Sequence, residues 1–307
     1  MSSSLPNARA LADGEVAMAR PVSLRPSGAS ISIRGVTKVF PSERGETLTV
    51  NDVSLEIRAG EFVCLLGPSG CGKSTLLNLV AGLDFPTEGE VVVGGEAVAG
   101  PGPDRTVMFQ DAALFPWLSL KDNVAFPLQL QGVDKKEIAA RVEKVLRMVH
   151  LWKFADAPIH ALSGGMRQRG ALARALVSEP GTLLMDEPFA ALDAQTRDML
   201  YGELENVWLA TGKTVVFVTH NVREAVRLGD RIVVLATRPG RVRKVIDVDL
   251  PRPRADADRN VSLLSAVVRN ALREEISRVQ KEEADDAWEM GSGPGSPDRR
   301  FGVGGGL

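Results

Sequence analysis

Three short apolar runs in the second half of the chain alternate with stretches of helical periodicity. The runs are TLLMDEP (182–188), TVVFVTH (214–220) and RIVVLA (231–236). The helical stretches lie around 164–178, 194–211 and 221–228. Continuous apolar runs of this length are typical of strands that are buried on both faces. The alternation therefore predicts a mostly parallel α/β sheet covered by helices.

The first part of the chain body has the pattern of strands that close on a turn. ISIRGVTKVF and LTVNDVSLEI precede the apolar run EFVCLLG, which ends in glycine, and STLLNLVAGL (74–83) then has the pattern of a helix. Residues 134–150 carry apolar side chains at helical spacing with charges between them. This pattern predicts a helical insertion between two halves of the sheet.

The two ends of the chain differ from the body. Residues 1–29 and 291–307 are small, polar and rich in Pro and Gly, so they cannot recover the entropy cost of ordering. We expect both to be disordered tails. Residues 251–290 are expected to form a helical extension packed on the body through one apolar face. That face comprises Leu264, Val268, Ala271, Leu272, Ile276 and Val279.

Composition narrows the class of protein. The chain has 307 residues, 44% of them hydrophobic, and a net charge of -2, which provides no general attraction to nucleic acid or anionic membranes. Its two cysteines, Cys64 and Cys71, allow neither a disulfide framework nor a four-ligand zinc set, which favours a reducing, cytosolic compartment. No apolar run approaches the ~20 residues that a membrane helix needs. We therefore expect no membrane span.

A glycine-rich segment, GPSGCGKST (67–75), follows the strand FVCLL and opens a helix. In this context the pattern G-x-x-x-x-G-K-[ST] indicates a phosphate cradle rather than a chance glycine turn. Backbone N–H groups would hold the phosphates, Lys73 would reach the β- and γ-phosphates, and the Ser74 hydroxyl would bind Mg²⁺. The predicted nucleotide-binding residues are Gly67, Pro68, Ser69, Gly70, Cys71, Gly72, Lys73, Ser74 and Thr75. The Cys71 thiol could be activated by Lys73 and the helix N-terminus, although a residue that merely fills the loop is the favoured interpretation.

Polar side chains that follow apolar strands supply the candidate chemistry. Asp186 is expected to hold Mg²⁺ through its hydration shell, and Glu187 to act as general base on the attacking water. The alternative for this pair is a plain turn with a helix cap. His220 could donate a hydrogen bond to the γ-phosphate, and Gln110 could touch both Mg²⁺ and the water. Otherwise His220 would be structural and Gln110 would cap a loop.

A second anion site is predicted at LSGGMRQ (162–168). A Ser hydroxyl, two flexible glycine amides and a helix N-terminus offer donors, but this segment has no lysine and no metal ligand. Such a half-site needs another group to complete it.

The ordered set GPSGCGKST, Gln110, LSGGMRQ, LLMDEP, ALD and His220 resembles the ATP-binding subunit of ABC transporters, over residues 31 to about 250. The resemblance implies an α/β P-loop NTPase core of the ABC ATPase type, with an N-terminal antiparallel β subdomain and a helical subdomain. The core would span 30–250 and the helical subdomain about 111–175.

The resemblance also implies that ATP and Mg²⁺ are bound between two copies of the chain that meet head to tail. Ser163, Gly164 and Gly165 of one copy would close over the γ-phosphate held by the other, with Gln168 in the same segment. Asp193 would reach across the dimer. Phe40 would stack on adenine, at a place where tyrosine is common in the family.

The same resemblance points to membrane partners. The segment after the glutamine, taken as the loop LFPWLSLKDNVAF (114–126), would receive a cytoplasmic helix of a separate permease. Its apolar socket would be Phe115, Pro116, Trp117 and Leu118, unless these residues form a buried loop cluster. The chain would then sit at the cytoplasmic face of the inner membrane and serve a solute-binding protein indirectly.

Two stretches, FPWLSLKDNVAFPLQLQG and VVLATRPGRV, look like the subfamily of importers for nitrate, taurine and aliphatic sulfonates. The alternative is a soluble ABC ATPase acting on DNA or ribosomes, but this chain has no zinc module, long coiled-coil insertion or second core, and no nucleic-acid partner is expected. A P-loop kinase or GTPase would leave LSGGMRQ without a purpose.

Overall fold

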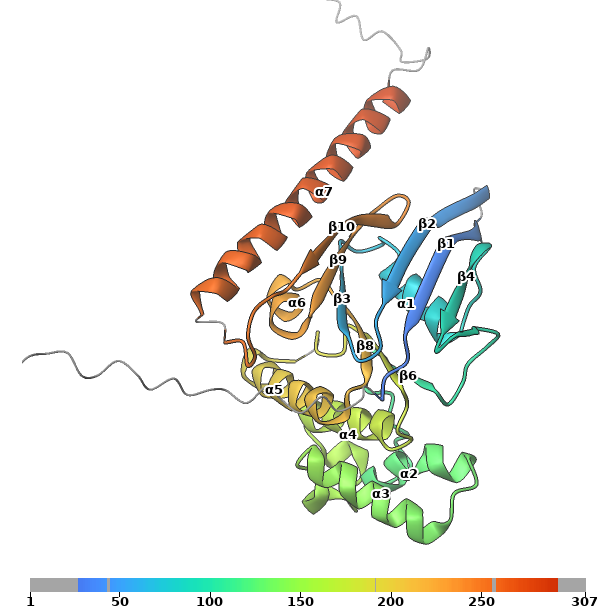
Figure 1. Cartoon of the computed structure of the whole chain (residues 1–307), viewed down its shortest axis with the longest axis vertical. Helices are drawn as coiled ribbons and strands as arrows, with labels where there is room; N and C mark the ends of the chain where they lie inside the picture. The colour runs from blue at the N-terminus through green and yellow to red at the C-terminus, as the bar shows by residue number, and fades with distance from the viewer. Residues whose placement is uncertain (1–26, 43–44, 191, 256–257, 292–307) are drawn as a thin grey trace, which may run out of the picture.

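The computed structural model describes residues 27–42, 45–190, 192–255 and 258–291. The expected tails fall largely outside these ranges, so their disorder stays a prediction. Within the described residues the strands form a four-stranded antiparallel sheet of order β2-β1-β4-β5 and a six-stranded sheet of order β10-β9-β3-β8-β7-β6 (Figure 1). The strands are β1 (Ile31–Ser42), β2 (Gly45–Ile57), β3 (Phe62–Leu66), β4 (Glu88–Val93), β5 (Glu96–Ala97), β6 (Arg105–Met108), β7 (Thr182–Asp186), β8 (Thr214–Thr219), β9 (Arg231–Ala236) and β10 (Arg241–Asp247). The helices are α1 (Lys73–Ala81), α2 (Leu120–Leu130), α3 (Lys135–Met148), α4 (Gly164–Leu176), α5 (Ala194–Thr211), α6 (Val222–Leu228) and α7 (Arg259–Gly291), with short 3₁₀ turns at Trp152–Phe154 and Ile159–Ala161.

The predicted α/β fold class is confirmed. In the six-stranded sheet, as far as the structure describes it, β9, β3, β8, β7 and β6 are parallel, and the edge strand β10 pairs antiparallel with β9. Strand β3 shows why the apolar runs are continuous. Its Phe62, Cys64 and Leu66 enter one buried cluster, and its Val63 and Leu65 enter a second cluster on the other face. The second cluster also contains side chains of α1 and of the antiparallel sheet, so α1 packs between the two sheets.

Apolar patterning did not predict strands β4, β5 and β10. Strand β10 is an edge strand whose Arg241, Arg243 and Lys244 are exposed. Charged residues commonly protect sheet edges from pairing with other chains, and they remove the apolar run by which a central strand is detected.

The segment 114–126 is only partly a loop, which corrects the sequence interpretation. Helix α2 begins at Leu120, and the Ser119 side chain caps it by accepting a hydrogen bond from the Asp122 N–H. The buried Asn123 closes the preceding loop, because its Oδ1 accepts from the Phe115 N–H at 2.7 Å and its Nδ2 donates to the Phe115 carbonyl at 3.0 Å. Prolines 116 and 127 obscured this helix in the sequence.

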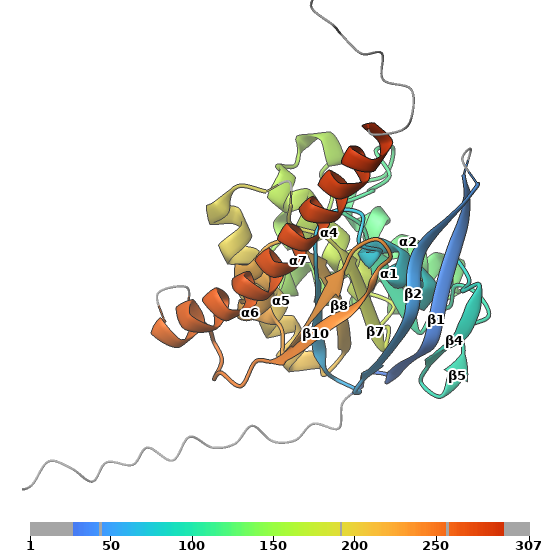
Figure 2. The same cartoon turned by 90° about the horizontal axis from the view of Figure 1, so that it is seen from above.

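Helix α7 runs past α6 and β10 and continues beyond the body (Figures 1 and 2). Its predicted buried face is wrong in part. Val268 and Ala271 are buried, but Ile276 is 37% exposed, and the Val279 side chain lies outside the described residues. Among the α7 side chains that the structure describes, which end at Arg278, the buried ones are Val261, Ser265, Val268, Ala271 and Glu275. Two of them are polar, so a search for apolar residues placed the face incorrectly. In the part of the chain that the structure describes, no helix combines the length and the apolar character needed to cross a membrane.

Candidate nucleotide-binding site

The glycine-rich loop joins β3 to α1. Gly70 and Gly72 have positive φ values of 76° and 85°, a region that residues with a Cβ rarely adopt. Gly67 is required for a different reason, because a Cβ there would lie 2.5 Å from the Cys71 Sγ. The loop is therefore shaped by glycine conformation at two positions and by close packing at a third.

Lys73 is buried at the start of α1. Its Nζ donates to the Gly67 carbonyl at 2.9 Å and to the Pro68 carbonyl at 2.8 Å. The Lys73 ammonium thus lies on the inner side of the loop. When a phosphate binds, its oxygens would replace the two carbonyl oxygens as acceptors of the Lys73 hydrogen bonds.

Cys71 is a loop residue whose side chain is buried, and its Sγ lies 3.8 Å from the Lys73 Nζ. Burial raises the pKa of the Cys71 thiol, and the opposing effect of the Lys73 charge does not reverse it. Burial thus opposes activation of the thiol, which supports the interpretation that Cys71 fills space in the loop.

Asp186 lies at the carboxyl end of β7, the same sheet edge from which the glycine-rich loop emerges. Burial raises the pKa of the Asp186 carboxyl, and the Glu187 charge adds to this, while a hydrogen bond from Ser74 and the Lys73 charge act in the opposite direction. The predicted metal ligands Asp186 and Ser74 are thus in contact. Their carboxylate and hydroxyl oxygens are the donors that Mg²⁺ prefers, so the site fits this ion.

Glu187 and His220 meet at the ends of the neighbouring strands β7 and β8. The Glu187 Oε2 lies 2.8 Å from the His220 Nδ1, and Glu187 has a φ of 45°, an uncommon value for a residue with a Cβ. A hollow of about 40 Å³ lined by both residues is large enough for a water molecule. A candidate base, a histidine partner and space for a water are therefore together.

A network behind His220 was missed from the sequence. The buried Glu224 of α6 accepts a hydrogen bond from the Tyr201 hydroxyl at 2.7 Å and another from the Thr219 hydroxyl. Burial and the Glu224 charge raise the pKa of Tyr201 above its usual range, so the phenol stays a donor. These contacts fix the turn that carries His220. The only sequence signal was a Glu four residues after the histidine on a predicted helix.

Gln110 lies on a cavity of about 620 Å³ that Asp186, Gly164 and Leu192 also line. Gln168 does not extend freely into this cavity. It is buried, and its Nε2 donates to the Pro188 carbonyl and, at 3.3 Å, to the Gln110 carbonyl. Gln168 thus ties the residue after the Asp186–Glu187 pair to the Gln110 loop.

The second glycine motif is the first turn of α4. The Ser163 side chain caps the helix by accepting from the Met166 N–H at 3.3 Å. Gly164 and Gly165 are helical, which corrects the expectation of flexible amides. A Cβ on Gly165 would lie 2.4 Å from the Thr196 Cγ2, so close approach to α5 explains this glycine.

Asp193 caps the adjacent helix α5. Its carboxylate accepts from the Thr196 N–H at 2.9 Å and from the Thr196 hydroxyl at 2.7 Å, and these hydrogen bonds lower the pKa of Asp193. Asp193, Ser163 and Gly164 are all exposed. The structure therefore presents two capped helix N-termini to solvent next to each other.

Phe40 lies on β1, half-exposed, with the Lys38 Nζ 4.8 Å from its ring centre. It pairs across the sheet with Thr47 of β2, the strand whose Val50 packs against Gly72 of the glycine-rich loop. The structure thus places the predicted adenine-stacking residue on the sheet that adjoins the loop.

The chain is similar to known proteins. Residues 50–190 match the family model described as ABC transporter. The chain is 45% identical over 251 residues to the uncharacterized ABC transporter ATP-binding protein MJ0412 of Methanocaldococcus jannaschii, covering 82% of this chain and 94% of that protein. It is 46% identical over 258 residues to the taurine import ATP-binding protein TauB of Burkholderia pseudomallei, covering 83% of this chain and 99% of that protein.

A solved structure is similar as well. The dimeric, post-hydrolysis ATP-binding cassette MJ0796 bound to ADP and Pi has a TM-score of 0.65 and 34% identity, covering 72% of this chain and 100% of that chain.

Proposed function

The chain belongs to the ATP-binding proteins of ABC transporters and is an ATPase that uses ATP with Mg²⁺, and from this premise we propose that it powers an importer for a small anion such as taurine, nitrate or a sulfonate. The relationship to the taurine import protein along nearly its whole length supports the importer class. The contact between Glu187 and His220 beside the glycine-rich loop is the observation that supports the catalytic assignment most directly.

In the proposed reaction, the loop 67–75 and Lys73 hold the triphosphate of ATP. Asp186 and Ser74, with Gln110, would hold Mg²⁺, and the bound ion would supply positive charge that stabilises the developing charge on the phosphate oxygens. Glu187 takes a proton from the attacking water. The Nδ1–H of His220 donates to the Glu187 carboxylate through the 2.8 Å contact and so orients it, and when the other ring nitrogen also carries a proton it donates a hydrogen bond to the γ-phosphate.

Two copies of the chain are proposed to complete the site. Ser163 and Gly164 at the start of α4 are exposed, and their helix offers backbone N–H groups to an anion. In a head-to-tail dimer they close over the phosphates bound by the second copy, and Asp193 lies at the contact. The dimeric form of the related cassette supports this arrangement.

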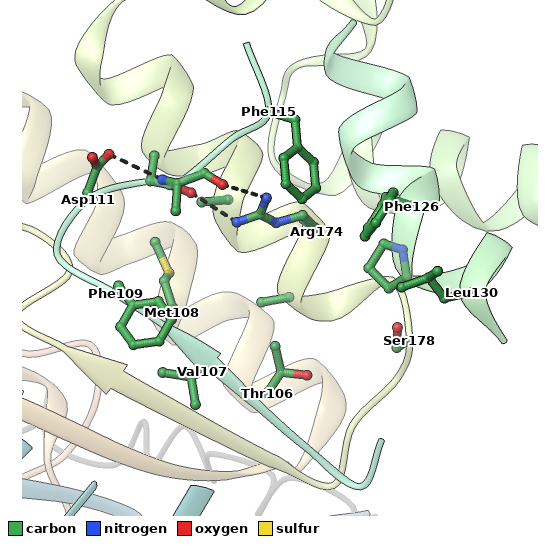
Figure 3. Close-up of a pocket in the computed structure, with 15 residues that line it drawn as sticks. Thr106, Val107, Met108, Phe109, Asp111, Phe115, Phe126, Leu130, Arg174 and Ser178 are labelled. Atoms are coloured by element: carbon green, nitrogen blue, oxygen red, sulfur yellow. Dashed lines mark hydrogen bonds between the residues drawn. The ribbon is translucent and has the colours of Figure 1, made fainter. Parts of the chain in front are cut away.

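The permease is proposed to dock on the surface between α2, α4 and the end of β6. A cavity of about 340 Å³ there is lined by apolar side chains that include Phe115, Phe126 and Leu130 (Figure 3). Arg174 fixes its rim by donating to the Ala112 and Ala113 carbonyls at 3.0 and 2.8 Å. Trp117 nearby is 75% exposed, which argues against the buried-cluster alternative. A cytoplasmic helix with an apolar face would fill this cavity and hold the chain at the membrane surface.

Co-purification tests the importer proposal. The tagged full-length chain is isolated from detergent-solubilised membranes of its native host, and the bound proteins are identified by mass spectrometry. A multi-span permease at comparable amount is the expected result. Recovery only from the soluble fraction, with ribosomes or nucleic acid, would contradict the proposal and favour the soluble ATPase class.

A further inference from the structure

Helix α7 carries a buried carboxylate that no part of the proposed reaction uses. Glu275 is 1% exposed, an unusual position for an ionisable side chain unless it is fully paired. Its Oε1 accepts from the Arg278 Nη2 at 2.6 Å, and its Oε2 accepts from the Arg278 Nε at 3.3 Å. Burial alone would raise the pKa of Glu275, but the hydrogen bonds from Arg278 and the Thr237 N–H lower it. The side chain is therefore a buried anion at neutral pH.

The Glu275 carboxylate and the Arg278 guanidinium are hydrogen-bonded to the backbone of Thr237. The Thr237 N–H donates to the Glu275 Oε1 at 3.1 Å, and the Thr237 carbonyl accepts from the Arg278 Nη2 at 3.3 Å. The Glu275–Arg278 pair thus engages both polar backbone groups of one residue. Thr237 opens the turn between β9 and β10, and this turn ends at Gly240.

The same turn packs against the glycine-rich loop. A Cβ on Gly240 would lie 2.4 Å from the Cys71 carbonyl oxygen, so the two backbones touch. The Gly240 N–H also donates to the Thr49 carbonyl, and its carbonyl accepts from the Asn51 N–H, both at 2.8 Å. On the other side, a Cβ on Gly67 would lie 3.0 Å from the Leu235 carbonyl. Residues 235–240 therefore form the floor of the phosphate-binding loop.

From this chain of contacts we infer that Glu275, together with Arg278, is a positioning residue of the ATP site, through which α7 holds the 237–240 turn against the phosphate-binding loop. The C-terminal helix is then part of the nucleotide-binding scaffold. The inference rests on the proposed role of the loop 67–75. In the alternative, helix α7 only adds buried apolar surface to the body. Removal of the Glu275 charge would then affect the whole body equally, whereas the positioning role predicts an effect on the phosphate-binding loop.

The test compares Glu275→Gln and Arg278→Gln with Glu274→Gln, a matched control on the exposed side of the same helix. The full-length proteins are assayed for the KM of ATP, for kcat, and for amide hydrogen exchange in a peptide covering 67–76, well below their unfolding temperatures. The loop contacts the triphosphate in the ground state and in the transition state, so its displacement weakens both equally. We expect Glu275→Gln to raise KM about threefold to tenfold and to speed exchange in the loop. kcat at saturating ATP should change by less than about twofold, and Glu274→Gln should match the parent.

Two results would overturn the inference: parental KM and loop exchange in Glu275→Gln, or exchange that increases throughout the body by the same factor. If Glu275→Gln fails to fold, Arg278→Gln, whose side chain is partly exposed, decides in the same way. Lys73→Ala in the same assays distinguishes failure of the proposed role of the loop 67–75 from failure of the proposed role of Glu275. If Lys73→Ala leaves ATP affinity unchanged, the proposed role of the loop is wrong. If it weakens affinity while Glu275→Gln does not, only the role of Glu275 is wrong.

Discussion

The Glu187 carboxylate lies 2.8 Å from the His220 imidazole although the two residues are 33 positions apart. Each residue directly follows a strand, and these strands, β7 and β8, are parallel neighbours. The left-handed backbone of Glu187 and its N–H bond to the Val218 carbonyl at 3.0 Å set the direction of its side chain. A strained backbone at such a position is typical of a functional site.

We predict that Glu187→Gln binds ATP and accumulates a closed dimer while hydrolysis falls about 10²–10⁴-fold. The amide keeps the size of the carboxylate but cannot accept the proton from water. ATP turnover and size-exclusion chromatography with ATP provide the measurement, with the exposed Glu96→Gln as control. Hydrolysis at the parental rate would remove Glu187 from the role of general base.

The two glycines of α4 give a matched pair of stability predictions. A methyl group at Gly165 would meet the Thr196 Cγ2 at 2.4 Å, whereas at Gly164 the nearest atom is a Leu192 methyl at 3.8 Å. Gly165→Ala is therefore expected to lower the free energy of unfolding by about 1–3 kcal/mol and to disturb the Thr196 contacts with Asp193. Gly164→Ala should leave stability unchanged or raise it by up to about 1 kcal/mol. Urea unfolding of both variants checks this, and equal losses would show that packing against Thr196 is not the cause.

The sequence predicted those elements of the fold whose burial produces a recognisable local pattern of apolar residues. Strands β7, β8 and β9 are apolar because both of their faces are buried, so their positions were predictable. The edge strand β10 has no apolar run because most of its residues are charged and exposed. In helix α2 the buried Leu120, Val124 and Leu128 do follow helical spacing, but Pro127 within the helix argued against a helix in the sequence.

In the candidate site, too, some residues could be predicted from local sequence and others could not. The glycine-rich loop and the Asp186–Glu187 pair could be proposed from the sequence because the residues of each are contiguous. Glu224 and Glu275 were missed because a buried acid on an amphipathic helix looks like a solvent-facing residue in the sequence, and Glu275 in addition binds a residue 38 positions away. Gly165 was assigned to flexibility because the sequence cannot show that α5 passes so close to it.

The Asp186 carboxyl leads to a prediction about pH. Burial raises its pKa in the folded protein, so the folded state binds the proton more tightly than the unfolded state does, and stability rises as the pH falls through the folded pKa. Asp186→Asn cannot ionise. It should therefore unfold about 1–3 °C higher than the parent at pH 7 without ligand, and this difference should shrink as the pH falls.

Asp193 provides a control of opposite sign for this pH prediction. Hydrogen bonds from Thr196 lower its pKa, so its contribution to stability is present above the unfolded pKa and is lost as the pH falls through the folded one. Asp193→Asn should not show the gain at neutral pH. Thermal unfolding from pH 4 to pH 8 measures both variants, and a loss of stability at pH 7 in Asp186→Asn would contradict the assignment.

The proposed permease surface is tested by Trp117→Glu. The Trp117 side chain is 75% exposed, and its ring contacts that of Phe115 in a tilted arrangement at a centroid distance of 5.4 Å. A charge there can therefore be solvated in the free subunit but not beneath a docked apolar helix. We expect the variant to fold and to keep ATPase activity within about twofold of the parent, while the permease no longer co-purifies. Phe154→Glu, which replaces another exposed aromatic residue, is the control and should retain the permease. Trp117 differs from Phe154 because its ring packs on Phe115, a residue that lines the cavity. Unfolding of Trp117→Glu would instead mean that Trp117 belongs to the core, and retention of the permease would place the docking surface elsewhere.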